Sequence, residues 1–220
     1  MFLRGGSMRR ILLLIIGFGG GLLAAMILLQ STVHALETDK TAVQLPCQVE
    51  QTPIRILSFQ SYDGSYIEDG SGDDVENIAS VVLENTGRHT LRNGAVKLLQ
   101  GRQVLVFSFT MLPPGEKILV MEKSRKPYSS QQIVSCWGWS LNHTPDRNIR
   151  IEEYSRSGFL VTNNGQQITS TSICFKSYDN QKDMFIGGYT YRINVSDLKP
   201  GIAKVVPMYR YIRGAYRIVD

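Results

Sequence analysis

The sequence predicts an all-β protein in which an N-terminal membrane helix is followed by two β-sandwiches. Two observations predict the sandwiches. After residue 40 almost no segment has helical periodicity, and short alternating runs of Val, Ile, Phe and Tyr recur between turns rich in Gly, Asn, Asp and Pro. A third observation, an uncharged apolar run near the N-terminus, predicts the helix.

The apolar run ILLLIIGFGGGLLAAMILL covers residues 11–29 and carries no charge. A helix of this length extends about 28 Å, which is close to the hydrocarbon thickness of a bilayer. Three arginines precede the run, whereas the first charge after it is Glu37. By the positive-inside rule, residues 1–10 are expected in the cytoplasm and the chain after residue 30 on the other side of the membrane.

Two outcomes are open for this N-terminal segment. The tripeptide Val33-His34-Ala35 offers a signal peptidase site after Ala35, and cleavage there would give a secreted protein. However, the apolar run is longer than the roughly 7–15 residues of a signal-peptide core, so we expect a retained single-pass anchor. Residues 30–50 are then expected to be a tether between the membrane and the folded part.

The part after the tether contains one pattern twice. ASVVLENTG at residues 79–87 and SGFLVTNNG at residues 157–165 each combine a strand with an Asn-x-Gly turn. MLPPGEKILVMEK at residues 111–123 and DLKPGIAKVVPMY at residues 197–209 each place a Pro-Gly turn before another strand. Because proline fixes φ and glycine permits the reversal, these turns are expected to join paired strands. They lack the run of free backbone N–H groups that a phosphate site requires.

Each copy has a turn signal about every ten residues, which is typical of a small β-sandwich. The first sandwich is expected at residues 51–146 and the second at residues 147–220. The second copy has extra residues within SYDNQKDMFIGGYTYR, where Gly187-Gly188 predicts a hairpin or a bulge.

The order strand, Asn-x-Gly, strand, strand, Leu-x-Pro-Gly, strand is similar to the immunoglobulin-like modules of bacterial envelope proteins, of the CARDB and FxLYD type. The resemblance covers about residues 50–215, and its motifs are structural. It implies two immunoglobulin-like modules outside a membrane anchor, with roles in binding, adhesion or assembly. It carries over no catalytic residues.

Charge and motifs argue against several classes of function. The net charge of +5 comes without a dense Lys/Arg run interleaved with aromatics, so we expect no nucleic-acid binding. The sequence has no metalloprotease, hydrolase, P-loop or dinucleotide motif. Neither His89 nor His143 lies in a nucleophile signature. We therefore expect no catalysis and no cofactor.

The acidic stretch DGSYIEDGSGDDVE raises the possibility of a calcium site. Asp69, Ser71 and Asp73 alternate like the first ligands of a calcium-binding loop. However, Asp74 stands where an EF-hand loop needs glycine, and Ser80 stands where it needs glutamate. The interpretation that we favour is a solvated loop without a metal, and the alternative is a calcium site of looser geometry.

The three cysteines, Cys47, Cys136 and Cys174, are too few and too far apart for a metal knuckle or a disulfide-stapled miniprotein. A location outside the cytoplasm permits a bridge between Cys47 and Cys136. The interpretation that we favour is that all three are small, buried hydrophobic residues.

Two stretches are candidate binding surfaces. In CWGWSL, Trp137 and Trp139 share a strand face with Leu141. Such a face usually points into the core, which is the interpretation that we favour; the alternative is a platform that stacks on a sugar ring or a peptide.

The second stretch is the C-terminal MYRYIRGAYRIVD. It interleaves tyrosines and arginines, at Tyr209, Arg210, Tyr211, Arg213, Tyr216 and Arg217. One interpretation is a docking strand for a partner. The simpler one is a last strand whose arginines keep its edge soluble. This stretch is the first choice for an interaction surface.

These features together predict a non-catalytic, single-pass protein of the cell membrane. Its two immunoglobulin-like modules are expected to interact with another envelope protein, in adhesion or assembly. The alternative is a module outside the cytoplasm that binds wall glycan or small solutes through its aromatic residues. An exported enzyme is the weakest hypothesis.

Overall fold

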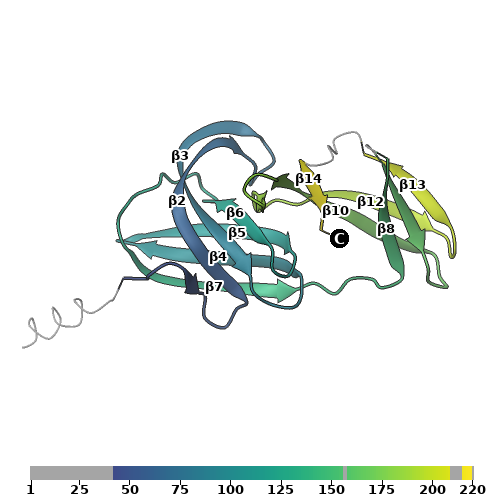
Figure 1. Ribbon diagram of the computed structural model, residues 1–220, viewed down its shortest axis with the longest axis horizontal. Coiled ribbons are helices and arrows are strands. Elements are labelled where there is room, and N and C mark those ends of the chain that lie inside the picture. The colour runs from purple at the N-terminus through teal and green to yellow at the C-terminus, as the bar shows by residue number, and fades with distance from the viewer. Residues whose placement is uncertain (1–41, 156–157, 209–214, 220) are drawn as a thin grey trace, which may run out of the picture. The chain divides into compact units, whose positions relative to one another are not determined.

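The computed structural model describes residues 42–155, 158–208 and 215–219 (Figure 1). These residues form fourteen β-strands and no helix, which confirms the all-β class. The strands are β1 (Cys47–Gln48), β2 (Ile54–Tyr66), β3 (Asp73–Asn85), β4 (Leu91–Gln100), β5 (Gln103–Leu112), β6 (Lys117–Met121), β7 (Ile133–Asn142), β8 (Ile149–Ser155), β9 (Gly158–Asn163), β10 (Thr169–Asp179), β11 (Met184–Ile186), β12 (Tyr191–Leu198), β13 (Ala203–Pro207) and β14 (Tyr216–Ile218).

Within those ranges, no helix has the length and the apolar character needed to cross a membrane. The predicted cytoplasmic segment at residues 1–10, the span at residues 11–29 and the cleavage site after Ala35 lie outside the described residues. The predicted tether is only partly described. Its last residues pack against the folded part, since β1 pairs with β2 and Val49 is fully buried. The tether is therefore shorter at this end than predicted.

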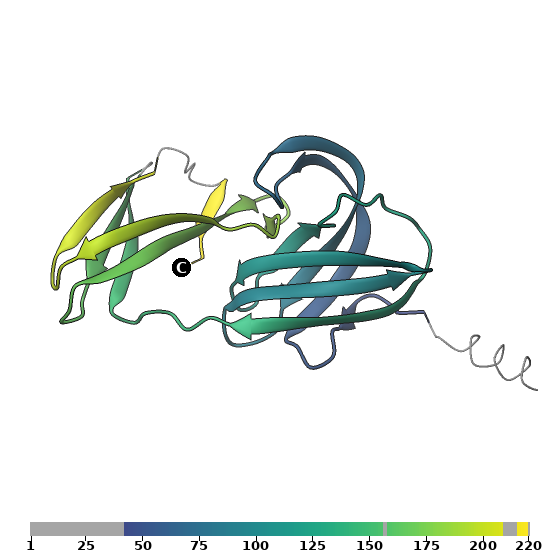
Figure 2. The same cartoon turned by 180° about the vertical axis from the view of Figure 1, so that it is seen from behind.

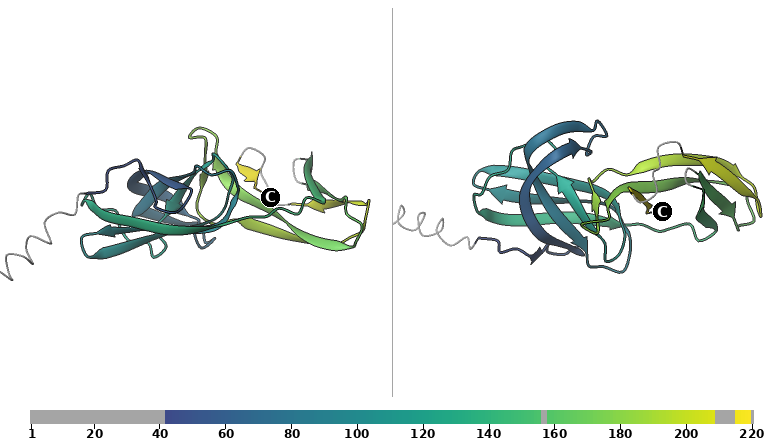
Figure 3. Two further views of the ribbon diagram at one scale, coloured as in Figure 1. Left: turned by 90° about the horizontal axis from the view of Figure 1, so that it is seen from below. Right: turned by 45° about the horizontal axis from the view of Figure 1, so that its top comes forward.

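Strands β1 to β7 form two sheets that face each other across one core. The first sheet has the order β1-β2-β3-β6 and the second the order β5-β4-β7. Alternate residues of both sheets point inward and fill this first core: Ile56, Val81, Leu83, Ile118, Val120, Val96, Leu98, Leu105 and Phe107. The far end of the β2–β3 hairpin bends over the outer side of its own sheet (Figures 1 and 3). There Tyr66, Ile78, Val82, Leu119 and Met121 form a smaller cluster.

The later strands repeat this arrangement. Strand β9 pairs with β8 and β13, just as β3 pairs with β2 and β6. Strand β10 pairs with β12 and β14, just as β4 pairs with β5 and β7. Their inward residues form a second core of Phe159, Val161, Ile173, Phe175, Val195, Leu198 and Val206. The repeated sequence pattern therefore corresponds to a repeated strand topology.

The Asn-x-Gly turn of the first repeat is held by a buried side chain. Asn85 Nδ2 donates to the carbonyl oxygens of His89 and Leu112, at 2.9 Å each. Its Oδ1 accepts from the backbone N–H of Gly87 at 3.0 Å. In the Pro-Gly turn, the N–H of Gly115 donates to the Asn85 carbonyl at 2.8 Å, from a φ of 73° that favours glycine. The two sequence motifs therefore meet through one asparagine.

The second repeat makes the same contacts. Asn163 Nδ2 donates to the carbonyl oxygens of Gln167 and Leu198, at 2.8 Å each, and Oδ1 accepts from the N–H of Gly165. Gly201 donates to the Asn163 carbonyl at 2.8 Å. Both Pro-Gly motifs are confirmed as chain reversals, but the expectation that each joins paired strands is wrong. The first leads from β5, which pairs with β4, to β6, which pairs with β3 in the other sheet. The second leads from β12, which pairs with β10, to β13, which pairs with β9.

The extra residues of the second repeat form the β10–β11 hairpin, so a hairpin is present in this stretch, as predicted. Its turn lies at residues 180–183, whereas Gly187-Gly188, where it was predicted, lies between β11 and β12. Strand β11 also pairs in parallel with β6, where Phe185 is opposite Ile118. As a result, the sheet of the first repeat continues through β11 into β10 and β12. The residues after Thr41 form a single compact unit.

Candidate functional site

The outer side of β7 carries three large hydrophobic side chains, which we call the aromatic face. Trp137, Trp139 and Leu141 alternate along the strand, and 41%, 49% and 56% of their surface is exposed. The alternation was predicted correctly. The interpretation that this face packs into the core is wrong.

The core side of β7 has no room for large residues. Val49 is fully buried there, and a Cβ on Gly138 would lie 3.2 Å from Val49 Cγ1. The same Cβ would lie 2.5 Å from the carbonyl oxygen of Ala95. Cys136 also packs against this core. The small residues of the strand therefore face inward, and the tryptophans face solvent.

Polar side chains adjoin the aromatic face on the same side of the sheet, which lies in front of β2 and β3 in Figure 2. Lys97 of β4 is opposite Trp137, and Asn93 is opposite Leu141. Residues that are directly opposite in an antiparallel pair share a face. Strand β5 continues these rows, with Val106 next to Lys97 and Thr110 next to Asn93. Flat apolar rings beside hydrogen-bonding groups form a surface suited to binding a sugar or a peptide.

Strand β7 is also the edge of its sheet. It pairs with β4 on one side, and no strand of the described residues pairs with its other side. Its sequence IVSCWGWSLN contains neither a charge nor a proline. Charges and prolines are the usual means by which a protein protects an exposed edge from pairing with another chain. An unprotected edge of this length is a place where a partner strand can add.

The opposite edge of the same sheet is covered. In β5, the N–H of Val106 donates to Glu122 Oε1 at 3.2 Å, and the Val106 carbonyl accepts from the N–H of Lys123 at 2.9 Å. The N–H of Thr110 donates to the carbonyl of Gly188 at 2.9 Å. Glu122 itself is fully buried. The chain thus satisfies the backbone of this uncharged edge. In β7, the carbonyl of Ile133 accepts from the N–H of Val43 at 2.9 Å, and the outer edge of the later residues of the strand pairs with no strand of the described part.

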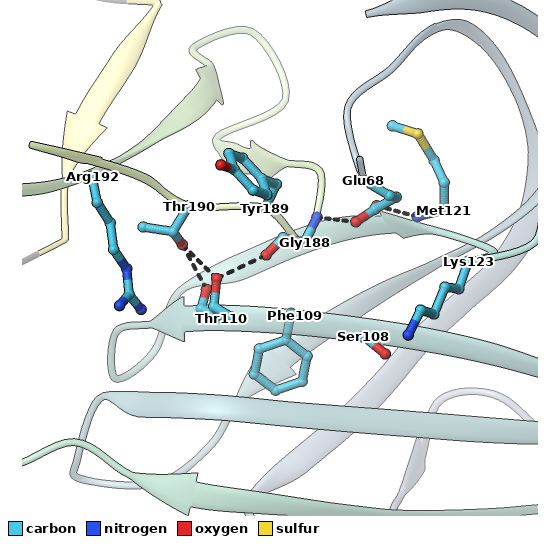
Figure 4. A pocket seen from close by; sticks show the side chains of 10 residues that line it. All are labelled: Glu68, Ser108, Phe109, Thr110, Met121, Lys123, Gly188, Tyr189, Thr190 and Arg192. Atoms are coloured by element: carbon cyan, nitrogen blue, oxygen red, sulfur yellow. Dashed lines mark hydrogen bonds between the residues drawn. The ribbon is translucent and has the colours of Figure 1, made fainter. Parts of the chain in front are cut away.

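A separate cavity of about 460 Å³ lies beside β5, β6 and the segment between β11 and β12 (Figure 4). Ten residues line it, and they bring together a carboxylate, two cationic side chains, hydroxyls and aromatic rings: Glu68, Ser108, Phe109, Thr110, Met121, Lys123, Gly188, Tyr189, Thr190 and Arg192. Figure 4 shows the Glu68 carboxylate directed at the backbone of Met121 and Gly188. This polar cluster joins residues of both repeats.

Two ionisable groups with shifted pKa values, Glu68 and Lys176, lie where β5, β6, β10 and the segment between β11 and β12 meet, which we call the junction. The Glu68 carboxylate accepts from the N–H groups of Met121 and Gly188, at 2.7 Å each. Burial raises the pKa of Glu68 to about 7, against the opposing effect of these two donors. Lys176 is fully buried, and burial lowers its pKa to about 7, whereas the charge of Glu68 opposes this shift.

Lys176 reaches the junction from β10. Its Nζ donates to the carbonyl oxygens of Thr110, Gly188 and Tyr189, at 3.0, 3.0 and 2.9 Å. It also contacts Thr190 Oγ1 at 3.2 Å. Three carbonyl acceptors around one amine favour its charged form. The ammonium group therefore ties β10 to β5 and to the segment after β11.

Glu68 is expected to make stability depend on pH. Between pH 4.5 and 7 the folded state retains a proton that the unfolded state has lost, so the free energy of unfolding falls as the pH rises. The expected loss across this window is on the order of 2 kcal/mol. Lys176 acts in the opposite sense between pH 7 and 10.5, where stability rises with pH.

Urea unfolding at pH 5 and pH 7 checks this prediction. Glu68→Gln removes the titrating carboxyl and should flatten the profile between these two pH values. Glu76→Gln, at an exposed carboxylate, should retain the wild-type profile. An unchanged profile in Glu68→Gln would contradict the assignment to Glu68.

The acidic loop gathers around an arginine. Arg125 Nη2 lies 2.9 Å from Asp69 Oδ2 and 2.9 Å from Asp73 Oδ2, and its guanidinium stacks 4.4 Å from the centre of the Tyr66 ring. The N–H of Ser71 and this guanidinium lower the pKa of Asp69 to about 2. Asp69 and Asp73, the two carboxylates considered as calcium ligands, thus both form ion pairs with the guanidinium of Arg125.

Only two of the six candidate tyrosines and arginines in the C-terminal stretch are described. Tyr216 packs on the second core, with its ring 5.7 Å from those of Phe175 and Tyr191. The guanidinium of Arg217 lies 3.4 Å from the centre of the Tyr178 ring. These two side chains therefore contribute to the fold. The other four lie outside the described residues: Tyr209, Arg210, Tyr211 and Arg213.

His89 and His143 belong to neighbouring segments, since the N–H of His143 donates to the carbonyl of Thr90 at 2.8 Å. His89 is exposed in the turn that Asn85 closes. His143 lines a cavity of about 390 Å³ together with Ser172 and Cys174. In the described ranges, no group of three or more His, Cys, Asp or Glu side chains is arranged to hold a metal ion.

Comparisons of the chain with models of known protein families, with curated proteins and with solved structures give no match. A role for the aromatic face or for the cavities is therefore inferred from geometry and chemistry alone. Sequence reasoning had singled out Trp137 and Trp139 by their spacing. It had missed the junction around Glu68 and Lys176, because no local pattern marks a lysine that becomes buried by distant segments.

Proposed function

We propose that this chain is a non-catalytic protein of the cell envelope, anchored by residues 11–29, that uses immunoglobulin-like modules outside the membrane to bind another envelope protein. The observation that carries the proposal is the aromatic face on β7. Nearly half of the surface of Trp137 and of Trp139 is exposed, on an uncharged strand. Tryptophan is among the residues that most often dominate the binding energy of a protein interface.

Two physical features of β7 favour a protein partner. The aromatic face offers apolar side chains for burial, and the open backbone edge offers hydrogen bonds to an added strand. A partner segment that pairs with this edge would place its side chains beside Trp137, Trp139 and Leu141. A single partner strand would thus hydrogen-bond to the backbone of β7 and at the same time cover the aromatic face.

The second candidate function is binding of wall glycan. The exposure of Trp137 and Trp139 favours it, because an exposed ring can stack on the apolar face of a sugar. Lys97 lies opposite Trp137 and Asn93 opposite Leu141, and both side chains can hydrogen-bond to sugar hydroxyls. This candidate uses the face of the sheet and leaves the open edge of β7 unexplained, so we rank it second.

Crosslinked recovery of the tagged, full-length protein from native membranes tests both candidates. Wild type is compared with Trp137→Ala/Trp139→Ala, and with Tyr154→Ala as a control at a tyrosine that is 64% exposed on β8. We expect one protein partner from wild type and from the control. Its recovery should fall about tenfold or more in the double variant, which corresponds to a loss of about 1.4 kcal/mol.

Two outcomes would go against the leading proposal. Equal recovery of the partner by wild type and by the double variant would show that the aromatic face is not the binding surface. Recovery of wall glycan without a protein, lost in the double variant, would replace the leading function by the second candidate. Circular dichroism of each variant serves as the folding control.

A further inference from the structure

Two cysteines from opposite sheets of the first repeat lie against each other. Cys47 belongs to β1 and Cys136 to β7, and their sulfur atoms are 3.8 Å apart. Both side chains are half-buried at the side of the sandwich where the two sheets end. The third cysteine, Cys174, lies in β10 and is buried. The interpretation of all three as buried hydrophobic residues therefore holds only for Cys174.

Independent strand registers fix the two sulfur positions. Cys47 is opposite Ile56 of β2, and Cys136 is opposite Leu98 of β4. Ile56 and Leu98 are both fully buried in the first core. The approach of the two sulfurs thus follows from how the sheets pack. A disulfide bond requires a sulfur separation of about 2.05 Å, so the two sulfurs must move closer by about 1.8 Å when it forms.

We propose that Cys47 and Cys136 form an intrachain disulfide in the exported protein, a covalent link between the two sheets of the first repeat. The link would fasten β1, and with it the end of the predicted tether, to the strand that carries the aromatic face. It goes beyond the binding function and does not depend on it. It depends on the location outside the cytoplasm, because disulfides persist in oxidising compartments.

The bond forms by exchange with a donor that itself carries a disulfide, such as an oxidoreductase of the envelope. One cysteine thiolate attacks a donor sulfur, which forms a mixed disulfide and releases one donor thiolate. The second thiolate then attacks the mixed disulfide and releases the other. Two electrons pass to the donor, and the two thiol protons end on its released sulfurs. Burial and the adjacent Cys136 raise the pKa of Cys47 to about 12, so little of the Cys47 side chain is thiolate at neutral pH. We therefore expect uncatalysed exchange at Cys47 to be slow.

Thiol counting on the full-length protein, purified from membranes without reductant, tests the proposal. The protein is denatured in N-ethylmaleimide, and its intact mass is recorded before and after reduction. With three cysteines in the chain, we expect one label before reduction, on Cys174, and three after it. Peptide mapping should find residues 47 and 136 in one linked pair. Three labels before reduction, a link that involves Cys174, or a dimer linked between chains would each overturn the proposal.

Matched variants extend the test to structure. Cys174→Ser should give no label before reduction and two after it. Reductant should lower the melting temperature of wild type and of Cys174→Ser by about 5–15 °C, since the closed loop spans 89 positions. Cys47→Ser/Cys136→Ser should melt at one temperature with or without reductant. A wild-type melting temperature that does not respond to reductant would overturn the link between the sheets. Because the labelling arm uses wild type, a variant that fails to fold does not affect it.

Discussion

Replacing Lys176 with Met is expected to lower the free energy of unfolding by about 3–5 kcal/mol, the usual cost of removing one partner from a buried charged cluster. Methionine is unbranched and one atom shorter than lysine, and it removes the N–H donors. The carbonyl oxygens of Thr110 and Gly188 would lose a buried hydrogen bond. Glu68 would lose the nearby positive charge that favours its carboxylate. Urea unfolding at pH 7 measures the change.

Lys182→Met is the matched control. This lysine is 61% exposed and lies 3.7 Å from Asp179, so its removal should cost less than about 1 kcal/mol. Adding Glu68→Gln to Lys176→Met should restore part of the lost stability, because no buried carboxylate is then left without its neighbouring cation. Equal effects of Lys176→Met and Lys182→Met would contradict the structural role of the junction.

Asn85→Ala is expected to cost about 2–4 kcal/mol, because three backbone groups lose their hydrogen bond inside the protein. Asn163→Ala should cost a similar amount in the second repeat, where the same bonds recur. Asn164→Ala, at the exposed neighbour, should change stability by less than about 0.5 kcal/mol. Denaturant unfolding monitored by tryptophan fluorescence measures all three variants.

The comparison of the two asparagines also tests the internal repeat. Trp137 and Trp139 both belong to the first repeat and report on it directly. If Asn85→Ala and Asn163→Ala differ by several kcal/mol in global stability, the motif does not have the same function in both copies. If neither variant is less stable than Asn164→Ala, the buried hydrogen bonds do not hold the turns.

Local chemistry made much of the fold predictable. Alternating apolar residues require a strand with one buried face, and Asn-x-Gly and Pro-Gly require turns. These rules identified the all-β class, the repeated pattern and the presence of a hairpin within residues 177–192, although its turn lies before β11 and not at Gly187-Gly188. They did not identify Asn85 and Asn163 as buried hydrogen-bonding groups. The signal was present, since each asparagine follows an apolar strand at the same place in both copies.

The direction of the aromatic face could not be read from its own residues. Period-two alternation shows that Trp137 and Trp139 lie on the same side of the strand. It does not show whether that side faces the core or the solvent. Val49 decides the outcome, because it fills the space above Gly138 from a segment that the sequence assigned to the tether. The inward side is left with small residues, and the large rings face solvent.

Long-range contacts explain the remaining differences from the sequence-based expectations. Arg125 lies more than fifty positions from the acidic loop that it neutralises. The separation between Cys47 and Cys136 is 89 positions. Arg125 was not foreseen as the partner of the acidic loop. The pair Cys47 and Cys136 was named from the sequence as the alternative interpretation, but the proximity of the two sulfurs became known only once the two sheets were packed.

The most direct measurement of the central claim is photo-crosslinking from the aromatic face in native membranes. A photoreactive amino acid replaces Leu141 in the full-length protein, and the control position is Val205 on β13, which is 51% exposed. We expect one crosslinked protein from position 141, none from position 205, and loss of the adduct when Trp137→Ala/Trp139→Ala is added. No adduct from position 141, or the same adduct from both positions, would contradict it.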